Sequence, residues 1–140
     1  MRVYAVIDTN VLVSALISRK DHTATVKILH EVLGGRIVPL LHPDIISEYE
    51  EVLKRPKFHL QPQTIARVLA AISQFGEWAE PTHFEGLLPD EDDRIFYEVT
   101  LGGSDLNSHL VTGNQKHYPA GPLVVTPAEM LEILEQEIGK

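Results

Sequence analysis

The sequence predicts an α/β fold in which a central, mainly parallel sheet is flanked by helices. Strand-like apolar runs alternate with helical patterns along the chain, as they do in proteins with parallel sheets. The first run, "VYAVI" at residues 3–7, is apolar without alternation, which is typical of a strand buried on both faces. The 140 residues are expected to form one domain, residues 1–140.

Six helices are predicted from apolar residues that recur at helical spacing. In chain order they cover residues 10–16, 23–33, 43–54, 62–75, 92–101 and 127–138. Local signals mark several of their ends. Gly34 and Gly35 end the second helix, Pro43 begins the third and Pro56 ends it, since proline suits a first helical turn but not an interior. The "GGS" segment that begins at Gly102 is interpreted as the C-cap of the fifth helix rather than as a glycine-rich phosphate loop.

Four further strands are predicted between these helices. They cover residues 36–40, 78–79, 108–112 and 123–125. In parallel sheets, functional sites form at the carboxyl ends of strands, where the strand order reverses. Asp8 follows the first strand, and Thr112, Gly113 and Asn114 follow the strand at 108–112. The predicted site therefore lies where these two strands end.

The composition is that of a globular protein and excludes some kinds of site. The chain is 44% hydrophobic and 23% charged. It contains no cysteine, which excludes disulfides and thiolate metal sites and suits a reducing cytoplasm. No apolar stretch approaches the roughly 20 residues of a membrane span, and no signal peptide is recognised, so a cytoplasmic protein without a membrane partner is expected.

The charge distribution gives opposing indications about a phosphate-bearing ligand. A formal net charge of −8 has the wrong sign for an ordinary nucleic-acid-binding protein. The dense basic stretch is "KRPKFH", with Lys54, Arg55 and Lys57. These cations either contact phosphate or end a helix in solvent, where they suit the helix dipole. The sequence favours neither interpretation.

Two acids, Asp8 and Glu48, lie beside predicted apolar segments, where the presence of a carboxylate has to be explained. Asp8 either caps the first helix, as aspartate often does, or faces a cleft while Thr9 or Asn10 provides the cap. Glu48 lies on the flank of the apolar face of its helix. A carboxylate there is costly unless it is paired, bound to a cation or partly exposed.

Four consecutive acids, residues 90–93, precede the helix predicted at 92–101. Asp92 is expected to cap that helix, which places Asp93 one step inside it. Acids in a first turn suit the helix dipole, but four together repel one another, and a divalent cation would relieve this. Carboxylates without cysteine suit Mg²⁺ or Mn²⁺, the ions that activate water against phosphodiesters. The seven histidines form no zinc pattern, and His117 is a further candidate beside the site.

Five segments together resemble the PIN domain, and most closely its bacterial branch of toxin components from toxin–antitoxin pairs. These are "VIDTNVLVSAL", the helix that carries Glu48, "DEDDRIFYEV", "LVTGNQKHYP" and "VVTPAEMLEIL". The resemblance implies a three-layer α/β/α fold with a central parallel sheet. It also implies a Mg²⁺- or Mn²⁺-dependent endoribonuclease, an RNA substrate, a cognate antitoxin protein and a homodimer.

The resemblance also assigns site residues. Asp8, Glu48 and Asp93 match the acids that hold the metal and act in catalysis. Further residues are accessory candidates at the site, namely Asn10, Asp92, Thr112 and Asn114. The candidate RNA contacts are Lys54, Arg55, Lys57 and Lys116. The family often has aspartate where this chain has Asn114, and the branch it resembles frequently has asparagine.

Two other functions remain open from the sequence. The acidic balance and Asn114 are compatible with a PIN-like module that binds RNA or a partner without cleaving. A phosphotransfer domain would use Asp8 as a nucleophile, but a haloacid-dehalogenase-like phosphatase needs Asp-x-Asp where this chain has Asp-Thr-Asn. Apolar residues in segments 23–33 and 65–72 add to the expectation of a homodimer.

Overall fold

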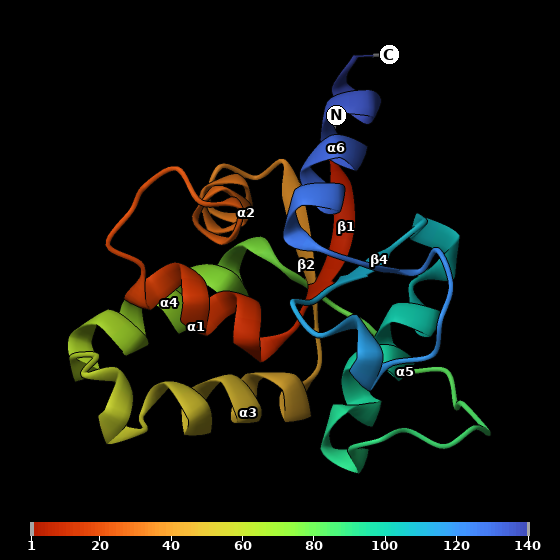
Figure 1. Ribbon diagram of the computed structural model, residues 1–140, viewed down its shortest axis with the longest axis horizontal. Coiled ribbons are helices and arrows are strands. Elements are labelled where there is room, and N and C mark those ends of the chain that lie inside the picture. The colour runs from red at the N-terminus through yellow and green to blue at the C-terminus, as the bar shows by residue number, and fades with distance from the viewer. Residues whose placement is uncertain (1, 140) are drawn as a thin grey trace.

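The computed structural model describes residues 2–139 and contains a five-stranded parallel sheet (Figure 1). The strand order is β3-β2-β1-β4-β5, and every pairing between neighbours is parallel. The strands are β1 (Val3–Ile7), β2 (Ile37–Leu41), β3 (Glu77–Trp78), β4 (His109–Val111) and β5 (Val124–Val125). This sheet confirms the α/β class that the alternation of strands and helices predicted.

In the described part of the chain, six α-helices surround the sheet. They are α1 (Thr9–Ile17), α2 (Ala24–Leu33), α3 (Pro43–Leu53), α4 (Pro62–Phe75), α5 (Arg94–Gly102) and α6 (Pro127–Ile138). Single 3₁₀ turns lie between them at η1 (Pro56–Phe58), η2 (Glu91–Asp93), η3 (Ser104–Leu106) and η4 (Gln115–His117). The predicted helices and strands are all present, with ends that differ by at most two residues. Within residues 2–139, no helix has both the length and the apolar character needed to cross a bilayer.

Side-chain alternation along the strands divides the core into two halves. Ala5 and Ile7 of β1 face a cluster that includes Val32 of α2 and Met130 of α6. Val6, between them, faces the other cluster, to which α3, α4 and α5 contribute. Because successive strand residues point to opposite faces, a strand covered on both sides must be apolar throughout. The helices on the two faces make the three-layer α/β/α arrangement.

The strand order reverses at β1, which places a crevice at its carboxyl end. The chain passes from β1 to β2 on one side and later returns to β4 on the other. Ile7 is in register with Val111 of β4, and the amide of Asp8 donates to the carbonyl oxygen of Val111 at 2.9 Å. The ends of β1 and β4 are therefore adjacent, as the position of polar residues after both strands predicted.

The start of α5 differs from the prediction. Asp92 does not cap the helix, because the carboxylate of Asp90 accepts a hydrogen bond from the Asp92 amide at 3.0 Å and closes a local turn. The acids 91–93 then form the 3₁₀ turn η2, and α5 begins at Arg94. Asp93 occupies the N-cap position without making a side-chain cap. Aspartate commonly competes with the helix in this way.

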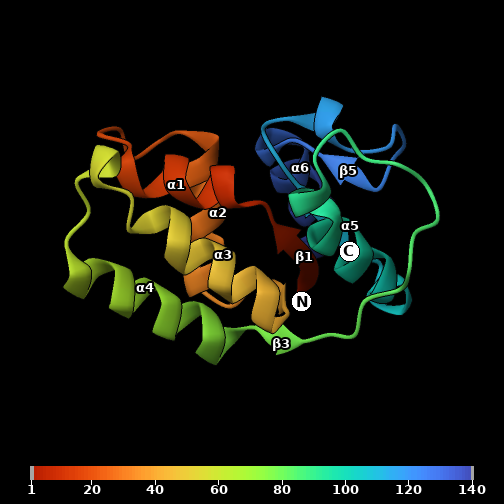
Figure 2. The same ribbon diagram turned by 90° about the horizontal axis from the view of Figure 1, so that it is seen from below.

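The long loop between β3 and α5 is fastened to α5 along its length. Figure 2 shows this loop passing around the outside of the molecule before it reaches α5. Inside it, the amide of Thr82 donates to the carbonyl oxygen of Glu98, and the amide of Phe84 donates to the Glu98 carboxylate, both at 2.9 Å. A Cβ atom on Gly102 would lie only 1.9 Å from the carbonyl oxygen of Glu80. Gly102 is thus needed for close approach of the loop.

Candidate active site

The carboxylate of Asp8 is buried at the end of β1 and held by three donors. Its Oδ2 atom accepts hydrogen bonds from Thr112 Oγ1 at 2.7 Å, Tyr118 Oη at 3.1 Å and Asn10 Nδ2 at 3.3 Å. The residue occupies the N-cap position of α1 but makes no side-chain cap, and it is only 5% exposed. Of the two interpretations of Asp8, the structure therefore supports an orientation toward neighbouring loops rather than a capping role.

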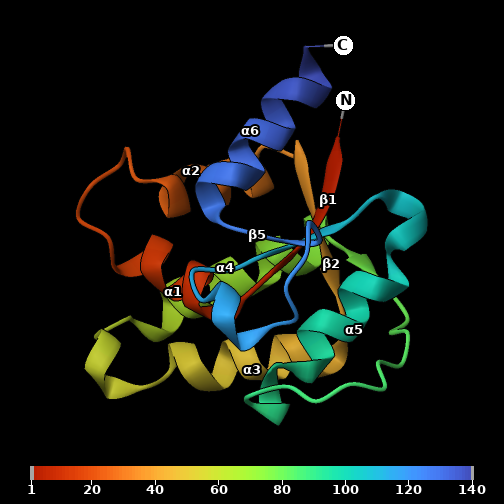
Figure 3. The same cartoon turned by 45° about the vertical axis from the view of Figure 1, so that its right-hand side comes forward.

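Asn10 and Thr112 connect α1 to the loop after β4. Asn10 Oδ1 accepts a hydrogen bond from the amide of Gly113 at 3.2 Å, and Thr112 Oγ1 accepts one from the amide of Asn114 at 3.0 Å. Figure 3 shows the segment after β4 returning beside the first turn of α1. Two predicted accessory residues thus position the loop that carries a third, Asn114.

Glu48 reaches the same region from the middle of α3. Its side chain is half-buried, as its place on the flank of the apolar face predicted. Its Oε2 atom accepts a hydrogen bond from Thr9 Oγ1 at 2.5 Å. The adjacent Tyr49 is fully buried, and its hydroxyl donates to the carbonyl oxygen of Ile7 at 2.5 Å. This bond connects α3 to the end of β1 and so fixes the position of Glu48 relative to Asp8.

Asp93 approaches from the opposite side, at the start of α5. It is half-buried, and its Oδ2 atom lies 3.4 Å from Nδ1 of His117 in η4. His117 was only a further candidate from the sequence, and the structure places it directly against this acid. The pair links the start of α5 to the loop after β4.

The three acids line one open groove of about 440 Å³. It is bordered by α1 and α3 and by the residues that lead into α5. Its acidic and polar part is lined by Asp8, Thr9, Asn10, Ser14, Glu48, Asp90, Asp92, Asp93, Asn114 and His117. The sheet topology thus brings together residues that are tens of positions apart in sequence.

Burial raises the pKa values of all three acids, and repulsion by neighbouring carboxylates adds to this at Glu48 and Asp93. Burial raises the pKa of Asp8, while hydrogen bonds from Thr112 and Tyr118 counter the effect. Burial, opposed by the Thr9 hydrogen bond and reinforced by the negative charge of Asp8, raises the pKa of Glu48. Burial and then the charge of Asp8 raise the pKa of Asp93 to about 6. The charges of the three carboxylates therefore interact, as is required of acids that share a cation.

The donor chemistry of the groove fits a hard divalent cation, but the side chains do not close around one point. Carboxylates that lack thiolate neighbours and repel each other are the usual ligands of Mg²⁺ or Mn²⁺. Among residues 2–139, however, no group of three or more His, Asp or Glu side chains has a geometry that could hold one ion. Instead, Asp8 and Glu48 accept from protein hydroxyls, and Asp93 faces His117.

The four basic candidates do not form one patch. Arg55 lines the acidic groove. Lys54 Nζ pairs with Glu50 at 3.2 Å, and Lys57 Nζ lies 5.1 Å from the centroid of the Phe58 ring. Lys116 borders a separate hollow beside η4. Lys54 is thus a solvated residue at a helix end, while Arg55 keeps access to the site.

Sequence reasoning missed three residues that support the acids. Thr9 was considered only as a cap, yet it donates to Glu48. Tyr118 and Tyr49 orient Asp8 and α3 from positions that are 110 and 42 residues from their partners along the chain. Burial raises the pKa of each tyrosine, so both remain hydroxyl donors at neutral pH. The "KHYP" segment drew attention to Tyr118 without indicating which group its hydroxyl would reach.

Comparison with known proteins gives one clear match. The sequence model of the PIN domain matches residues 4–116, which is most of the chain and includes Asp8, Glu48, Asp93 and Asn114. No curated protein and no solved structure matches the chain.

Proposed function

The chain belongs to the PIN domain family, which has a nuclease-type fold, and on that premise we propose that it is a divalent-metal-dependent endoribonuclease. One observation carries this proposal. Asp8 follows β1, Glu48 lies on α3 and Asp93 ends the turn η2. All three line one groove at the carboxyl end of the sheet. In open α/β sheets this is the position where ligands bind.

The protein's own residues have distinct parts in the proposed reaction. When bound, Mg²⁺ or Mn²⁺ would acidify a water molecule and offset negative charge on the phosphodiester. Asp8, Glu48 and Asp93 would hold the ion. Thr112 and Tyr118 keep the Asp8 carboxylate oriented, and Thr9 does the same for Glu48.

The acidic groove also explains why a cation would be needed before RNA can approach. Five acidic residues line it, against one arginine, Arg55. Phosphate would be repelled from such a surface until a divalent ion compensates part of the charge. Arg55 is placed to contact the RNA backbone once this has happened.

We extend the proposal to the role of toxin in a toxin–antitoxin pair, with an antitoxin protein as cognate partner. The support is the resemblance of the "VIDTNVLVSAL" and "TGNQKHYP" segments to that branch of the family. Induced expression in a bacterial host is expected to stop growth, and expression of the Asp8→Asn variant is expected not to. Growth inhibition by both proteins would contradict a role that depends on cleavage.

The activity is tested with a mixed pool of end-labelled RNA. Wild-type protein with Mn²⁺ or Mg²⁺ is expected to cut the pool, and excess chelator is expected to stop cutting. Asp8→Asn should remove the activity, while Asp105→Asn, at an exposed position in η3, should keep it. Cleavage that survives Asp8→Asn would assign the activity to a contaminant or to another site.

A binding module without catalysis is the second candidate. It is favoured by the absence of a convergent metal-ligand set among residues 2–139 and by the amide at Asn114. For such a module, the same pool would be bound but not shortened. A phosphotransfer role for Asp8 is not proposed, since its carboxylate is buried and accepts from three donors.

A further inference from the structure

The groove that holds the acids has a second half with different chemistry. This half is lined by Val13 and Ile17 of α1, Val52 of α3, Phe58 of η1 and the guanidinium-bearing Arg55. We call these five residues the apolar half of the groove. Ile17 is 47% exposed there, although large aliphatic side chains are usually covered. The proposed reaction at the acids does not use any of these residues except Arg55.

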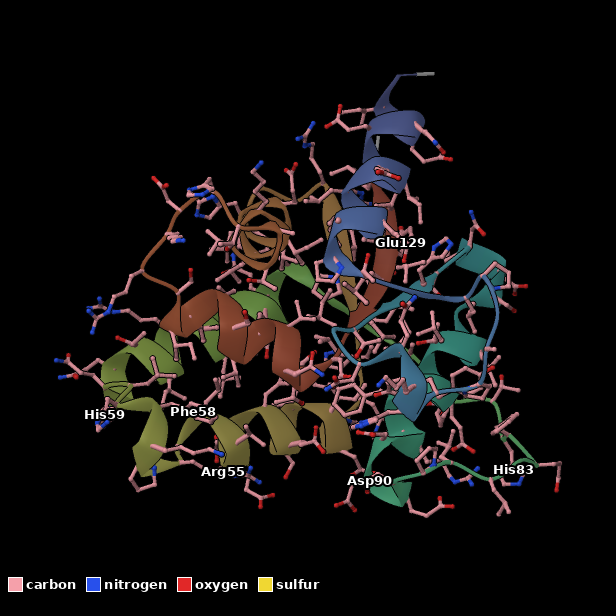
Figure 4. The ribbon with its side chains drawn as sticks, in the orientation of Figure 1. Arg55, Phe58, His59, His83, Asp90 and Glu129 are labelled. Carbon is pink, nitrogen blue, oxygen red and sulfur yellow. The ribbon has the colours of Figure 1, made fainter. Side chains whose placement is uncertain are left out.

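Helical spacing places the apolar half directly beside the acids. On α1, Val13 lies one turn after Thr9, and Ile17 lies one turn further on the same face. On α3, Val52 lies one turn after Glu48. One turn of helix is about 5.4 Å, so the backbone positions of the apolar half begin about that far along α1 from Thr9 and along α3 from Glu48. Figure 4 shows Phe58 and Arg55 around the C-terminal part of α3, with Asp90 toward the other end of that helix.

The chemistry of the apolar half suits a planar, uncharged ring attached to a phosphate. Proteins hold unpaired nucleobases by stacking them on aromatic side chains or arginine, with aliphatic groups around the ring. Phe58 supplies an aromatic ring, Val13, Ile17 and Val52 supply aliphatic walls, and Arg55 supplies a cation. Lys57 adds a second cation, whose Nζ lies over one face of the Phe58 ring, 5.1 Å from the centroid, so a base would stack on the other face or displace it.

We propose that the apolar half of the groove is a nucleobase subsite. It holds the base next to the phosphodiester that is cut, with the ring against Phe58 and the adjoining phosphate near Arg55. The proposal rests on the proposed ribonuclease function and deepens it, because it assigns residues that select which phosphodiester enters the site. A base held in this way has left its stack and its pairing partner, so duplex RNA is excluded.

Abasic substitution in the RNA tests the subsite. After the cut has been mapped in a labelled single-stranded oligonucleotide, each nucleotide beside it is replaced in turn by an abasic ribose. One of these replacements is expected to lower kcat/KM by about 5- to 140-fold, the range of base–aromatic stacking. Equal cutting of the intact and all abasic oligonucleotides would overturn the subsite and leave this half of the groove free for a polypeptide.

Variants identify the protein side of the contact. Phe58→Leu keeps apolar packing but removes the aromatic ring, and is expected to lower kcat/KM on the intact oligonucleotide by a similar factor. Cleavage by Phe58→Leu should also be insensitive to the abasic replacement. The effects of two changes that remove the same contact are not additive. Phe75→Leu is the matched control, since Phe75 is 41% exposed at the end of α4 and is not among the residues that line the groove. An additive loss in Phe58→Leu would overturn the assignment.

Two further variants keep the test valid if Phe58→Leu folds poorly. Ile17→Ser changes a half-exposed position and is expected to reduce sensitivity to the abasic replacement without lowering thermal stability. Arg55→Gln is expected to weaken binding of intact and abasic oligonucleotides alike, and to reduce the salt dependence of binding. Arg67→Gln, on the exposed side of α4, is its control.

The test separates failure of the subsite from failure of the proposed function. If wild-type protein cuts no RNA, the same oligonucleotides are used in a fluorescence anisotropy assay with Mg²⁺. Weaker binding of one abasic oligonucleotide, and loss of that difference in Ile17→Ser, would support the subsite in a protein that does not cut. Equal binding of every oligonucleotide would overturn it.

Discussion

Asp8 shows how the environment of one residue prepares a carboxylate for a function. Burial raises its pKa, while hydroxyl donors at Thr112 and Tyr118 stabilise the charged form. A buried polar atom must be satisfied, so these donors also fix the direction of the side chain. A cation entering the groove would therefore meet an acid that is already oriented.

Glu48→Gln separates a role in cation binding from a structural role. The glutamine oxygen can still accept the Thr9 hydrogen bond, but the half-buried charge that Asp8 repels is removed. We expect RNA cleavage to fall by about 100-fold or more, the scale of lost charge stabilisation at a metal site. The midpoint of thermal unfolding in chelator should stay equal or rise.

The control for this variant is Glu132→Gln, at an exposed position on α6 that does not line the groove. Both proteins are compared by single-turnover cleavage and by thermal scans without metal. Wild-type activity in Glu48→Gln would make Glu48 a boundary residue of the helix and remove it from the candidate site.

Asp93 makes the stability of the metal-free protein depend on pH in a defined direction. Its pKa rises from 3.8 to about 6 on folding, so the folded state holds the proton more tightly than the unfolded state does. The contribution of Asp93 to stability is then fully present below about pH 4 and is lost as the pH rises through about 6. Asp8 and Glu48 act in the same direction.

Asp93→Asn should therefore make the stability of the metal-free protein depend less on pH. In chelator, we expect the variant to be more stable than wild type at pH 7 and to lose this advantage toward pH 4. Thermal midpoints measured at half-unit intervals of pH check the difference. A wild-type advantage at pH 7 would show that the charged form of Asp93 is favoured in the fold, contrary to its surroundings.

Asn114→Asp tests whether the loop after β4 belongs to the cation site. Asn114 is exposed and lines the same groove as Asp8 and Asp93. One more negative charge several ångströms from a divalent ion should tighten binding by about tenfold. It should also lower metal-free stability, because four acids then repel one another. A Mn²⁺ titration by calorimetry compares the two proteins, and an unchanged midpoint would place Asn114 outside the site.

At the level of elements, Arg94 determines how the long loop meets α5. Its guanidinium donates to the carbonyl oxygens of Phe84 at 2.7 Å and Gly86 at 2.8 Å, and forms a two-pronged pair with Glu91. It also lies 3.6 Å from the Glu98 carboxylate. Because Arg94 directly follows Asp93, these bonds hold the loop where the acidic turn η2 enters the groove.

Arg94→Lys keeps the positive charge but removes the planar fork that reaches several acceptors at once. We expect the loop to open more often, with several-fold faster cutting by a Glu-specific protease near Glu85 and lower RNA cleavage. Limited proteolysis followed by mass measurement locates the cut. Arg67→Lys is the control, and equal proteolysis of the Arg94 variant and wild type would show that other contacts, such as those of Glu98, hold the loop alone.

The elements themselves could be predicted from sequence because each has a local cause. The helix at 127–138 follows from a capping box, in which Thr126 and Glu129 each accept the other's backbone amide. The start of α5 was misplaced because Asp90, not Asp92, forms the turn. The donors to Asp8 could not be predicted, since neither periodicity nor spacing says which side chains meet across a sheet edge.

At the scale of the whole molecule, the negative charge and the acidic groove reinforce each other. The net charge of −8 is unfavourable for RNA, and the five acids that line the groove add to this where the proposed substrate would enter. The homodimer stays a prediction, but the structure weakens one of the observations that suggested it, the apolar residues of segments 23–33 and 65–72. Apolar residues of the segments that suggested it are buried within the chain's own core, among them Val26, Ile28, Val32, Ile65 and Ile72.

This charge balance predicts an unusual response of RNA binding to salts. A basic RNA-binding protein loses affinity whenever salt is added. Here, binding in chelator should be negligible and should increase with divalent ion, while NaCl of equal ionic strength should give no increase. Anisotropy of labelled RNA, with Ca²⁺ in place of Mg²⁺ to slow cutting, measures both series. Equal effects of the two salts would show that the ion acts only by screening.

The hydrogen bonds of Asp8 also impose an order in time on the synthesis of the protein. Its partners Thr112 and Tyr118 lie 104 and 110 residues later in the chain. At translation rates of about 5–20 residues per second, the ribosome adds them roughly 5–20 s after Asp8. Throughout that interval the nascent chain contains the first acid without the groove that orients it. For the proposed ribonuclease, this order would leave the messenger and the ribosome that produce it uncut until its synthesis is nearly finished.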